Sequence, residues 1–272
     1  MQAANRLQKA LKAGSPAFGA WQMLPGTNLT RTICRSAPNL DWLLVDLEHG
    51  NVSDDGMHEI VAAAAACGTS PIVRVAEGQH WMIKRALDAG AHGIMVPMIE
   101  TIDDARRVVE YSKFPPRGKR GFEALLAVDK FVSTTADGQI RQLTGVEYLQ
   151  QADEGLVIAV QIETKDALEN IDAIAAIDGI DVLFIGPFDL SVNIGCPIPG
   201  AEENDYAPEL RDAIWRIYQA GRKNGKAVGV YCDTGEQGKA YAERGFQMIN
   251  VVTDMVGLKK VVRGEFEVAG SV

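Results

Sequence analysis

Two carboxylates that are suited to hold a metal ion follow two apolar runs in the middle of the chain. Glu163 comes directly after the run 156–162, and Asp189 comes shortly after the run 181–185. Each run predicts a buried parallel strand, and residues 165–177 between them have a helical rhythm. Neighbouring parallel strands end at the same edge of a sheet, so both carboxylates are expected there, where their oxygens favour Mg²⁺ or Mn²⁺. Alternatively, Glu163 caps the helix that follows it, and Asp189 caps the turn into Leu190-Ser191.

A second group of ionisable residues follows an earlier predicted strand. Asp46, Glu48 and His49 lie at its end, and Arg74 lies inside the next apolar run, PIVRV. Carboxylates beside an imidazole raise its basicity, which suits His49 for general acid–base work near neutral pH. A charged Arg74 in a buried strand requires an anion, either the Asp46 carboxylate or, as the favoured interpretation, a substrate oxyanion.

The order of the predicted elements indicates how these residues are brought together. Strands alternate with helices, and this pattern predicts an α/β fold, a single (β/α)₈ TIM barrel over residues 1–272 with its active site at the carboxyl ends of the strands. A helix at 4–13 is expected to close the bottom of the barrel. The rhythm breaks over 117–154, between strands 4 and 5, which we interpret as an excursion above the sheet with no clear strand. An open doubly wound sheet is the alternative, but no Gly-rich fingerprint follows the first strand. The predicted strands are 17–23, 41–46, 71–75, 92–97, 156–162, 181–185, 227–232 and 247–252.

Composition narrows the class of protein. The 272 residues include 27 basic and 36 acidic side chains, and the net charge of −9 disfavours nucleic acid as a partner. No apolar run approaches the roughly 20 residues that span a membrane, and the N-terminus lacks the apolar core of a signal peptide, so a cytoplasmic location is expected. The four cysteines have neither metal-ligand spacing nor disulfide density.

Five motifs resemble a known family in both order and spacing. The match covers roughly residues 16–260, and it identifies the chain as similar to the HpcH/HpaI family of metal-dependent class II pyruvate aldolases. The motifs are DLEHG at 46–50, VRV around Arg74, PPRGKRG at 115–121, QIET at 161–164 and IGPFDLS at 185–191.

The resemblance implies roles for particular residues. It assigns a divalent metal to Glu163 and Asp189, with Mg²⁺ or Mn²⁺ preferred and Co²⁺ or Zn²⁺ also compatible. It further implies a homo-hexamer built as a trimer of dimers, for which the segments 79–87 and 255–266 are candidate contact surfaces. The implied catalytic residues are His49, Arg74, Asp46 as the acid linked to that histidine, and Asp88 acting from a neighbouring subunit; the implied substrate-binding residues are Arg74, Gln161 and the backbone of Gly186, Phe188 and Asp189.

The function implied is that of a carbon–carbon lyase, which cleaves or forms 4-hydroxy-2-oxo acids from a 2-oxo acid and an aldehyde through a pyruvate enolate. No lysine lies at a comparable strand end, which disfavours a Schiff-base aldolase. One alternative is an oxaloacetate decarboxylase that uses the enolate for bond formation, as macrophomate synthase does; another is a non-catalytic barrel that binds 2-oxo acids. Phe188, Phe122-Glu123 and the segment YCDTGEQ at 231–237 depart from the common pattern, so the substrate stays open.

Overall fold

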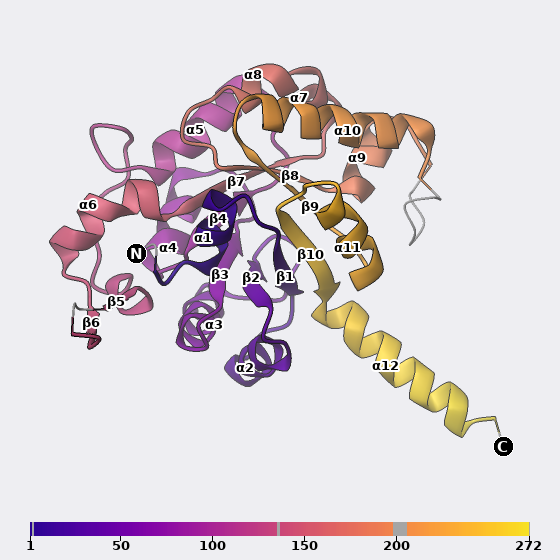
Figure 1. Ribbon diagram of the computed structural model, residues 1–272, viewed down its shortest axis with the longest axis horizontal. Coiled ribbons are helices and arrows are strands. Elements are labelled where there is room, and N and C mark those ends of the chain that lie inside the picture. Colours follow the sequence, from indigo (N-terminus) through magenta and orange to yellow (C-terminus); the bar gives the residue numbers. More distant parts are fainter. Residues whose placement is uncertain (2, 135–136, 198–205, 272) are drawn as a thin grey trace.

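The eight parallel strands close into a barrel, as the strand count predicts (Figure 1). The structure is a computed structural model that describes residues 1, 3–134, 137–197 and 206–271. Around the barrel the strands follow the order β1-β10-β9-β8-β7-β4-β3-β2. Their bounds are β1 Ala17–Gln22, β2 Leu40–Asp46, β3 Ser70–Arg74, β4 Gly93–Val96, β7 Val157–Ile162, β8 Val182–Ile185, β9 Ala227–Val230 and β10 Met248–Thr253.

Strand register brings the predicted site residues to one edge. Asp46 and Arg74 are paired positions at the ends of β2 and β3. Ile162 of β7 is paired with Ile185 of β8, so Glu163 and Gly186 each follow the last paired residue of neighbouring strands. The carboxyl ends of these four strands therefore carry the side chains expected to react.

Helices surround the barrel, and several begin at a side-chain N-cap. The side chains of Ser53 and Thr164 accept hydrogen bonds from the N–H groups of Gly56 and Ala167. The helices are α1 Arg6–Lys12, α2 Thr27–Ser36, α3 Asp54–Ala66, α4 His80–Asp88, α5 Ile102–Ser112, α6 Gly145–Gly155, α7 Lys165–Glu169, α8 Ile171–Ala175, α9 Pro187–Asn193, α10 Pro208–Lys223, α11 Gly235–Glu243 and α12 Asp254–Ala269.

The single helix predicted over 165–177 is wrong, because it is divided at Asn170. This residue is both the C-cap of α7 and the N-cap of α8. Its side-chain amide donates to the carbonyl of Asp166, which is the local competition with helical bonding that asparagine favours. The helical spacing of apolar residues continues across Asn170, which is why the sequence predicts one helix.

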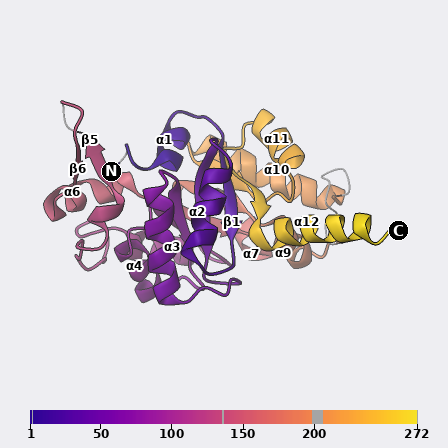
Figure 2. The same ribbon diagram turned by 90° about the horizontal axis from the view of Figure 1, so that it is seen from below.

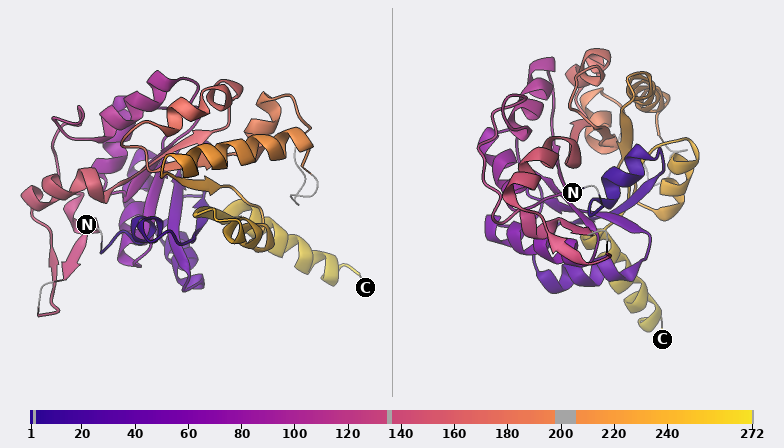
Figure 3. Two further views of the ribbon diagram at one scale, coloured as in Figure 1. Left: turned by 45° about the horizontal axis from the view of Figure 1, so that its top comes forward. Right: turned by 60° about the vertical axis from the view of Figure 1, so that its left-hand side comes forward.

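Two apolar cores lie inside and outside the ring of strands. The inner core contains Trp42, Phe184 and Met248 together with Leu7, which α1 inserts into it. The side chain of Asn5 donates to the carbonyls of His92 and Gly155, which ties α1 to the amino end of the barrel. The right-hand view of Figure 3 shows this N-terminal segment across one end of the ring, so the predicted role of the helix in closing the bottom is confirmed.

The excursion at 117–154 differs from its prediction in position and in content. It connects α5 to the start of β7, and its Lys130 carbonyl lies 2.8 Å from Nε2 of His92, which precedes β4. It therefore packs at the amino ends of the strands and not above the carboxyl ends. It also contains a short antiparallel pair, β5 Val132–Thr134 with β6 Ile140–Gln142, before α6. These three-residue strands carry too little alternation to be recognised in sequence.

The final helix leaves the body of the protein. α12 extends away from the barrel in Figures 1 and 2, and none of its described residues is buried. Within the described residues, every helix is too short or too polar to span a bilayer.

Candidate active site

A cavity of about 410 Å³ opens at the carboxyl ends of the strands. Most of the residues predicted from sequence for the site line it, although they come from four separate strand ends. Polar and aromatic side chains share its wall. The lining residues are Trp21, Met23, Asp46, His49, Arg74, Gln161, Glu163, Gly186, Pro187, Phe188, Asp189, Tyr206, Tyr231, Asp233 and Thr253.

Glu163 is a buried carboxylate held in one orientation. Its Oε1 accepts from the Met98 N–H at 2.9 Å, and its Oε2 accepts from Nε2 of Gln161 at 2.9 Å. Met98 has a positive φ of 50°, an uncommon backbone state for a residue with a side chain, and this state aims its N–H at the carboxylate. Burial raises the pKa of Glu163 to about 7, and the charge of Asp189 adds to that rise.

The residues at this position fit a hard cation with two protein ligands. Glu163 and Asp189 line the same cavity, and a Cβ at Gly186 would collide with the Glu163 carboxylate, so the chain keeps this space free of side chains. Within the described residues, no group of three or more His, Cys, Asp and Glu side chains is arranged to hold a metal. Mg²⁺ and Mn²⁺ accept one or two carboxylates and take their other oxygens from water and substrate, whereas a structural zinc site needs four protein ligands.

Arg74 is fixed by ionic contacts on two sides. Its Nε and Nη2 donate to the two Asp46 oxygens at 3.0 and 2.7 Å. Its Nη1 lies 2.8 Å from Oε2 of Glu48, and its guanidinium stacks 4.7 Å from the Trp21 ring. Burial alone would raise the pKa of Asp46, but the hydrogen bonds and charge of Arg74 outweigh it, and the pKa lies below its usual value. The sequence left two possible anionic partners for Arg74, the Asp46 carboxylate and a substrate oxyanion, and the structure shows the pair with Asp46.

His49 is oriented by a different acid from the one expected. The imidazole Nε2 of His49 lies 3.6 Å from Oε1 of Glu48. Asp46 contacts His49 through the backbone instead, because its Oδ1 accepts from the His49 N–H. The prediction that Asp46 pairs with the imidazole is wrong in this respect, because both Asp46 oxygens face Arg74 and Trp21. Burial raises the pKa of Glu48, against the opposing charge of Arg74.

The start of α9 forms one wall of the cavity. Gly186 is its N-cap and Pro187 its first residue, so the backbone N–H groups of Phe188 and Asp189 fall in the first turn, where a helix has no carbonyl partners for them. Phe188 is 55% exposed at the rim. Gln161 lies deeper: its Oε1 accepts from Arg74 Nη1 at 3.4 Å while its amide donates to Glu163, so it links the two halves of the site.

Asp88 lies outside this cavity. It ends α4, and its carboxylate accepts from Nη2 of Arg120 at 2.9 Å, beside the buried Tyr148 hydroxyl. Within one chain it is part of the contact between α4 and the excursion. A contribution to the site of a neighbouring subunit stays a prediction.

Sequence reasoning missed the aromatic side of the cavity. Trp21 donates from Nε1 to Asp46 at 3.0 Å, and its ring meets Tyr231 edge-on at 5.4 Å. The Tyr231 hydroxyl is 2.7 Å from that of Thr253. Tyr231 and Asp233 belong to the segment YCDTGEQ, and the departure of this segment from the common pattern was a signal that they belong to the site. Trp21 could have been found from its place at the end of the first predicted strand.

Comparison with known proteins shows which family the chain is similar to. A family model described as HpcH/HpaI aldolase/citrate lyase matches residues 23–259. A hydroxypyruvate/pyruvate aldolase of Agrobacterium fabrum is 33% identical over 259 residues, which are 95% of this chain and 91% of that protein. A 2-keto-3-deoxy-L-rhamnonate aldolase of Salmonella gallinarum is 35% identical over 225 residues, 83% of this chain and 78% of that protein. The crystal structure of macrophomate synthase has a TM-score of 0.84 and 26% identity, and the match covers 98% of this chain and 89% of that chain.

Proposed function

The chain belongs to the HpcH/HpaI aldolase/citrate lyase family, and from that premise we propose that it cleaves 4-hydroxy-2-oxo acids into pyruvate and an aldehyde. It also forms these acids by the reverse condensation. The observation that carries this proposal is the shared cavity: Glu163, directly after β7, and Asp189, in the first turn of α9, line it together with Arg74 and His49. A cation at Glu163 and Asp189 would polarise the 2-oxo group as a Lewis acid and stabilise negative charge on its oxygen.

Substrate binding is assigned to the first turn of α9 and to Arg74. The N–H groups of Phe188 and Asp189 can receive the carboxylate of the oxo acid, since the helix leaves them without internal partners. Arg74 is held in place by Asp46 and Glu48, so its guanidinium meets a developing enolate oxygen with little reorganisation.

Proton transfer is assigned to His49, positioned by Glu48. In the cleavage direction the imidazole takes the proton of the 4-hydroxyl group. The bond between C3 and C4 breaks, the aldehyde leaves, and the electron pair becomes the enolate of pyruvate. A proton then returns to C3 and gives pyruvate. At 3.6 Å from its Nε2, the Glu48 carboxylate stabilises the imidazolium that forms.

A direct assay tests the proposal. Purified protein with Mg²⁺ or Mn²⁺ should release pyruvate from a 4-hydroxy-2-oxo acid, and chelation should stop the release. Glu163→Gln and Asp189→Asn should each lose most activity and bind the metal more weakly while the fold is retained. Full activity of both variants with the metal still bound would contradict the assigned site.

The cavity also supports a second candidate, decarboxylation of oxaloacetate followed by use of the enolate. Four aromatic side chains line the cavity, and they suit an apolar or planar acceptor better than a small aldehyde requires; they are Trp21, Phe188, Tyr206 and Tyr231. Consumption of oxaloacetate at a higher kcat/KM than any 4-hydroxy-2-oxo acid would favour this candidate.

For the assembly we retain the homo-hexamer as a proposal, with α4 as one contact. Trp81 on this helix is 58% exposed and lies beside a small apolar depression that includes Leu47 and Met82. A subunit packed over α4 would cover that surface and approach Asp88, the last residue of the helix. Light scattering that shows a monomer at micromolar concentration would exclude both the assembly and the role of Asp88.

A further inference from the structure

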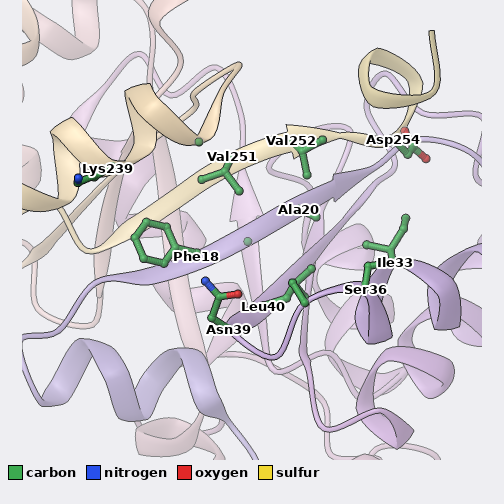
Figure 4. A pocket seen from close by; sticks show the side chains of 13 residues that line it. Phe18, Ala20, Ile33, Ser36, Asn39, Leu40, Lys239, Val251, Val252 and Asp254 are labelled. Carbon is green, nitrogen blue, oxygen red and sulfur yellow. The ribbon is translucent and has the colours of Figure 1, made fainter. Parts of the chain in front are cut away.

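The active-site cavity differs in its charge from a second cavity of the same volume, about 410 Å³, on the outside of the barrel. Figure 4 shows this outer groove, where mostly apolar side chains of β1, β10 and α2 meet. Of the described residues, the active-site cavity is lined by four carboxylates and one guanidinium, from Asp46, Glu163, Asp189, Asp233 and Arg74. A divalent cation adds two positive charges and an oxo acid one negative charge, so the filled cavity remains negative.

Asp233 is the carboxylate in this group that has neither a task nor a cation beside it. Asp46 pairs with Arg74, while Glu163 and Asp189 are assigned to the metal. The described part of the chain contains every lysine and arginine, and none of them forms an ion pair with Asp233. Burial raises the pKa of Asp233, and no charge from that part of the chain opposes the rise. A cation that arrives with the substrate would therefore be favoured at this position.

Two tyrosine rings belong to the same part of the wall. Tyr231 and Asp233 both line the cavity, while Cys232 between them is buried in the outer core, so the alternation of a strand continues past the end of β9. Gln237 ties Tyr206 to this segment: its Nε2 donates to the Tyr206 hydroxyl at 2.7 Å, and its Oε1 accepts from the Asp233 N–H at 3.0 Å. Burial raises the pKa of Tyr231, and the charge of Asp233 adds to that rise, which indicates that the two groups are close.

Depth in the cavity separates the positions of the two reactants. Arg74 and Glu163 are buried, whereas Asp233 is exposed at the rim. The oxo acid is assigned to the buried residues, so Asp233 and the two tyrosine rings are left for the substituent of the aldehyde.

We propose that the cavity selects an aldehyde that carries a quaternary ammonium group, with Asp233 as the residue that determines this specificity. The carboxylate supplies the opposite charge, and the negative faces of the Tyr206 and Tyr231 rings attract an alkylated cation. A neutral substituent of the same shape gains neither attraction. The inference rests on the proposed aldol reaction and adds the class of aldehyde that the reaction uses.

The first test measures binding and requires no turnover. Choline and 3,3-dimethylbutan-1-ol have nearly the same shape, but only choline is charged, because nitrogen replaces one carbon. In calorimetry on protein loaded with Mg²⁺ and pyruvate, the dissociation constant of choline should be lower by on the order of tenfold or more. Asp233→Asn should bring the ratio of the two constants to about one, and Asp233→Glu should keep most of the preference, because it retains the charge.

Glu236→Gln is the matched control for the loss of one negative charge. Glu236 is an exposed acid in the first turn of α11, three residues from Asp233, and it is not among the described residues that line the cavity. This variant should keep the wild-type ratio, whereas a general effect of net charge would lower the ratio in both variants. The groove in Figure 4 can take up the neutral alcohol equally in all variants, so a change in the ratio reports on the active-site cavity.

The second test measures condensation with pyruvate. The matched aldehydes are trimethylammonioacetaldehyde and 3,3-dimethylbutanal, with concentrations expressed as free, unhydrated aldehyde. Wild type should use the cationic aldehyde with a kcat/KM higher by on the order of tenfold, mainly through a lower KM, and high salt should reduce the difference. Asp233→Asn should lose this preference.

The outcomes separate this inference from the proposed function. Equal affinity for choline and the neutral alcohol in wild type, or an undiminished preference in Asp233→Asn, would overturn the inference. Condensation of both aldehydes at equal kcat/KM would also overturn it, although the aldol reaction itself would stand. Failure to release pyruvate from any 4-hydroxy-2-oxo acid would contradict the proposed function, and the choline measurement would still decide whether the cavity selects a cation.

Discussion

Gly186 lies against the Glu163 carboxylate so closely that a Cβ at position 186 would collide with it. The glycine therefore leaves room for the carboxylate to be oriented by Met98 and Gln161. We expect Gly186→Ala to displace Glu163 and to weaken Mn²⁺ binding, measured by calorimetry, about as much as Glu163→Gln does. Gly145→Ala is the control, since a Cβ there makes only ordinary contacts. Unchanged affinity in Gly186→Ala would separate Glu163 from the metal.

Glu163, the proposed metal ligand, is expected to destabilise the fold when no metal is bound. Burial and the nearby acids raise its pKa to about 7, so its ionised form is unfavourable in the chelated protein. We expect Glu163→Gln to raise the Tm of the chelated protein at pH 8, by roughly 2 to 4 °C for each 1 kcal/mol of relief. Asp189→Asn should show no such gain, because Asp189 is exposed. An equal or lower Tm in Glu163→Gln would contradict this account.

His49 and Arg74 should differ in which reactions they serve. His49→Ala should impair aldol cleavage and spare much of oxaloacetate decarboxylation, since loss of CO₂ forms the enolate without removing a hydroxyl proton. Arg74→Ala should impair both, by on the order of 10²–10³ in rate. Arg74→Lys should recover little, because Asp46 pairs with the guanidinium through two hydrogen bonds. The measurement is kcat/KM for both reactions at saturating metal.

Two outcomes would reassign these residues. Equal loss of both reactions in His49→Ala would remove its proton-transfer role. Unimpaired decarboxylation in Arg74→Ala would reduce Arg74 to the structural partner of Asp46. The structure adds a companion variant: Glu48→Gln should reproduce part of the His49→Ala defect in cleavage and shift its pH profile, because Glu48 is the acid that faces the imidazole.

His92 should make the fold sensitive to acid. Burial lowers its pKa to about 4 from a usual 6.5, although the hydrogen bond to the Lys130 carbonyl opposes this. A lowered folded pKa means that the stabilisation is complete above pH 6.5 and is lost as the pH falls toward 4, by about 3 kcal/mol in total. Tm measured from pH 7 to pH 4 should fall less steeply in His92→Gln than in wild type, whereas half-buried His58→Gln should keep the wild-type slope.

The charges around the cavity should select the aldehyde. Of the described residues that line it, Arg74 alone is a lysine or arginine, and Asp46 and Glu48 already pair with it. Asp233 adds a further acid at the rim, with a pKa raised by burial. We expect uncharged hydroxyaldehydes to be used at least tenfold better, in kcat/KM, than aldehydes that carry a carboxylate. Asp233→Asn should narrow that ratio; a preference for anionic aldehydes in the wild type would contradict it.

The sequence predicts the strands and the site residues correctly where a single local pattern determines the structure. Buried runs with turn residues between them define the eight barrel strands, and the strand ends then place Glu163, Asp189 and Arg74 at one edge. It failed where two local signals competed. Asn170 interrupts an apolar rhythm that continues on both sides of it, and Asp46 and Glu48 are both near His49 in sequence. Only the side-chain directions at the end of β2 decide which acid meets the imidazole and which meets Arg74.

The closed amino end of the barrel determines the order in which substrates bind and products leave. Leu7 of α1 fills the inner core from that side, so reactants reach the site only through the carboxyl ends. Glu163 and Arg74 lie deep in the cavity at 2% and 7% exposure, whereas Phe188 stands at its mouth. An oxo acid bound at the deep residues is then covered by the aldehyde that arrives after it. On the proposed assignment of the site, we therefore expect cleavage to release the aldehyde first and pyruvate last, so that pyruvate is a competitive product inhibitor and the aldehyde a noncompetitive one.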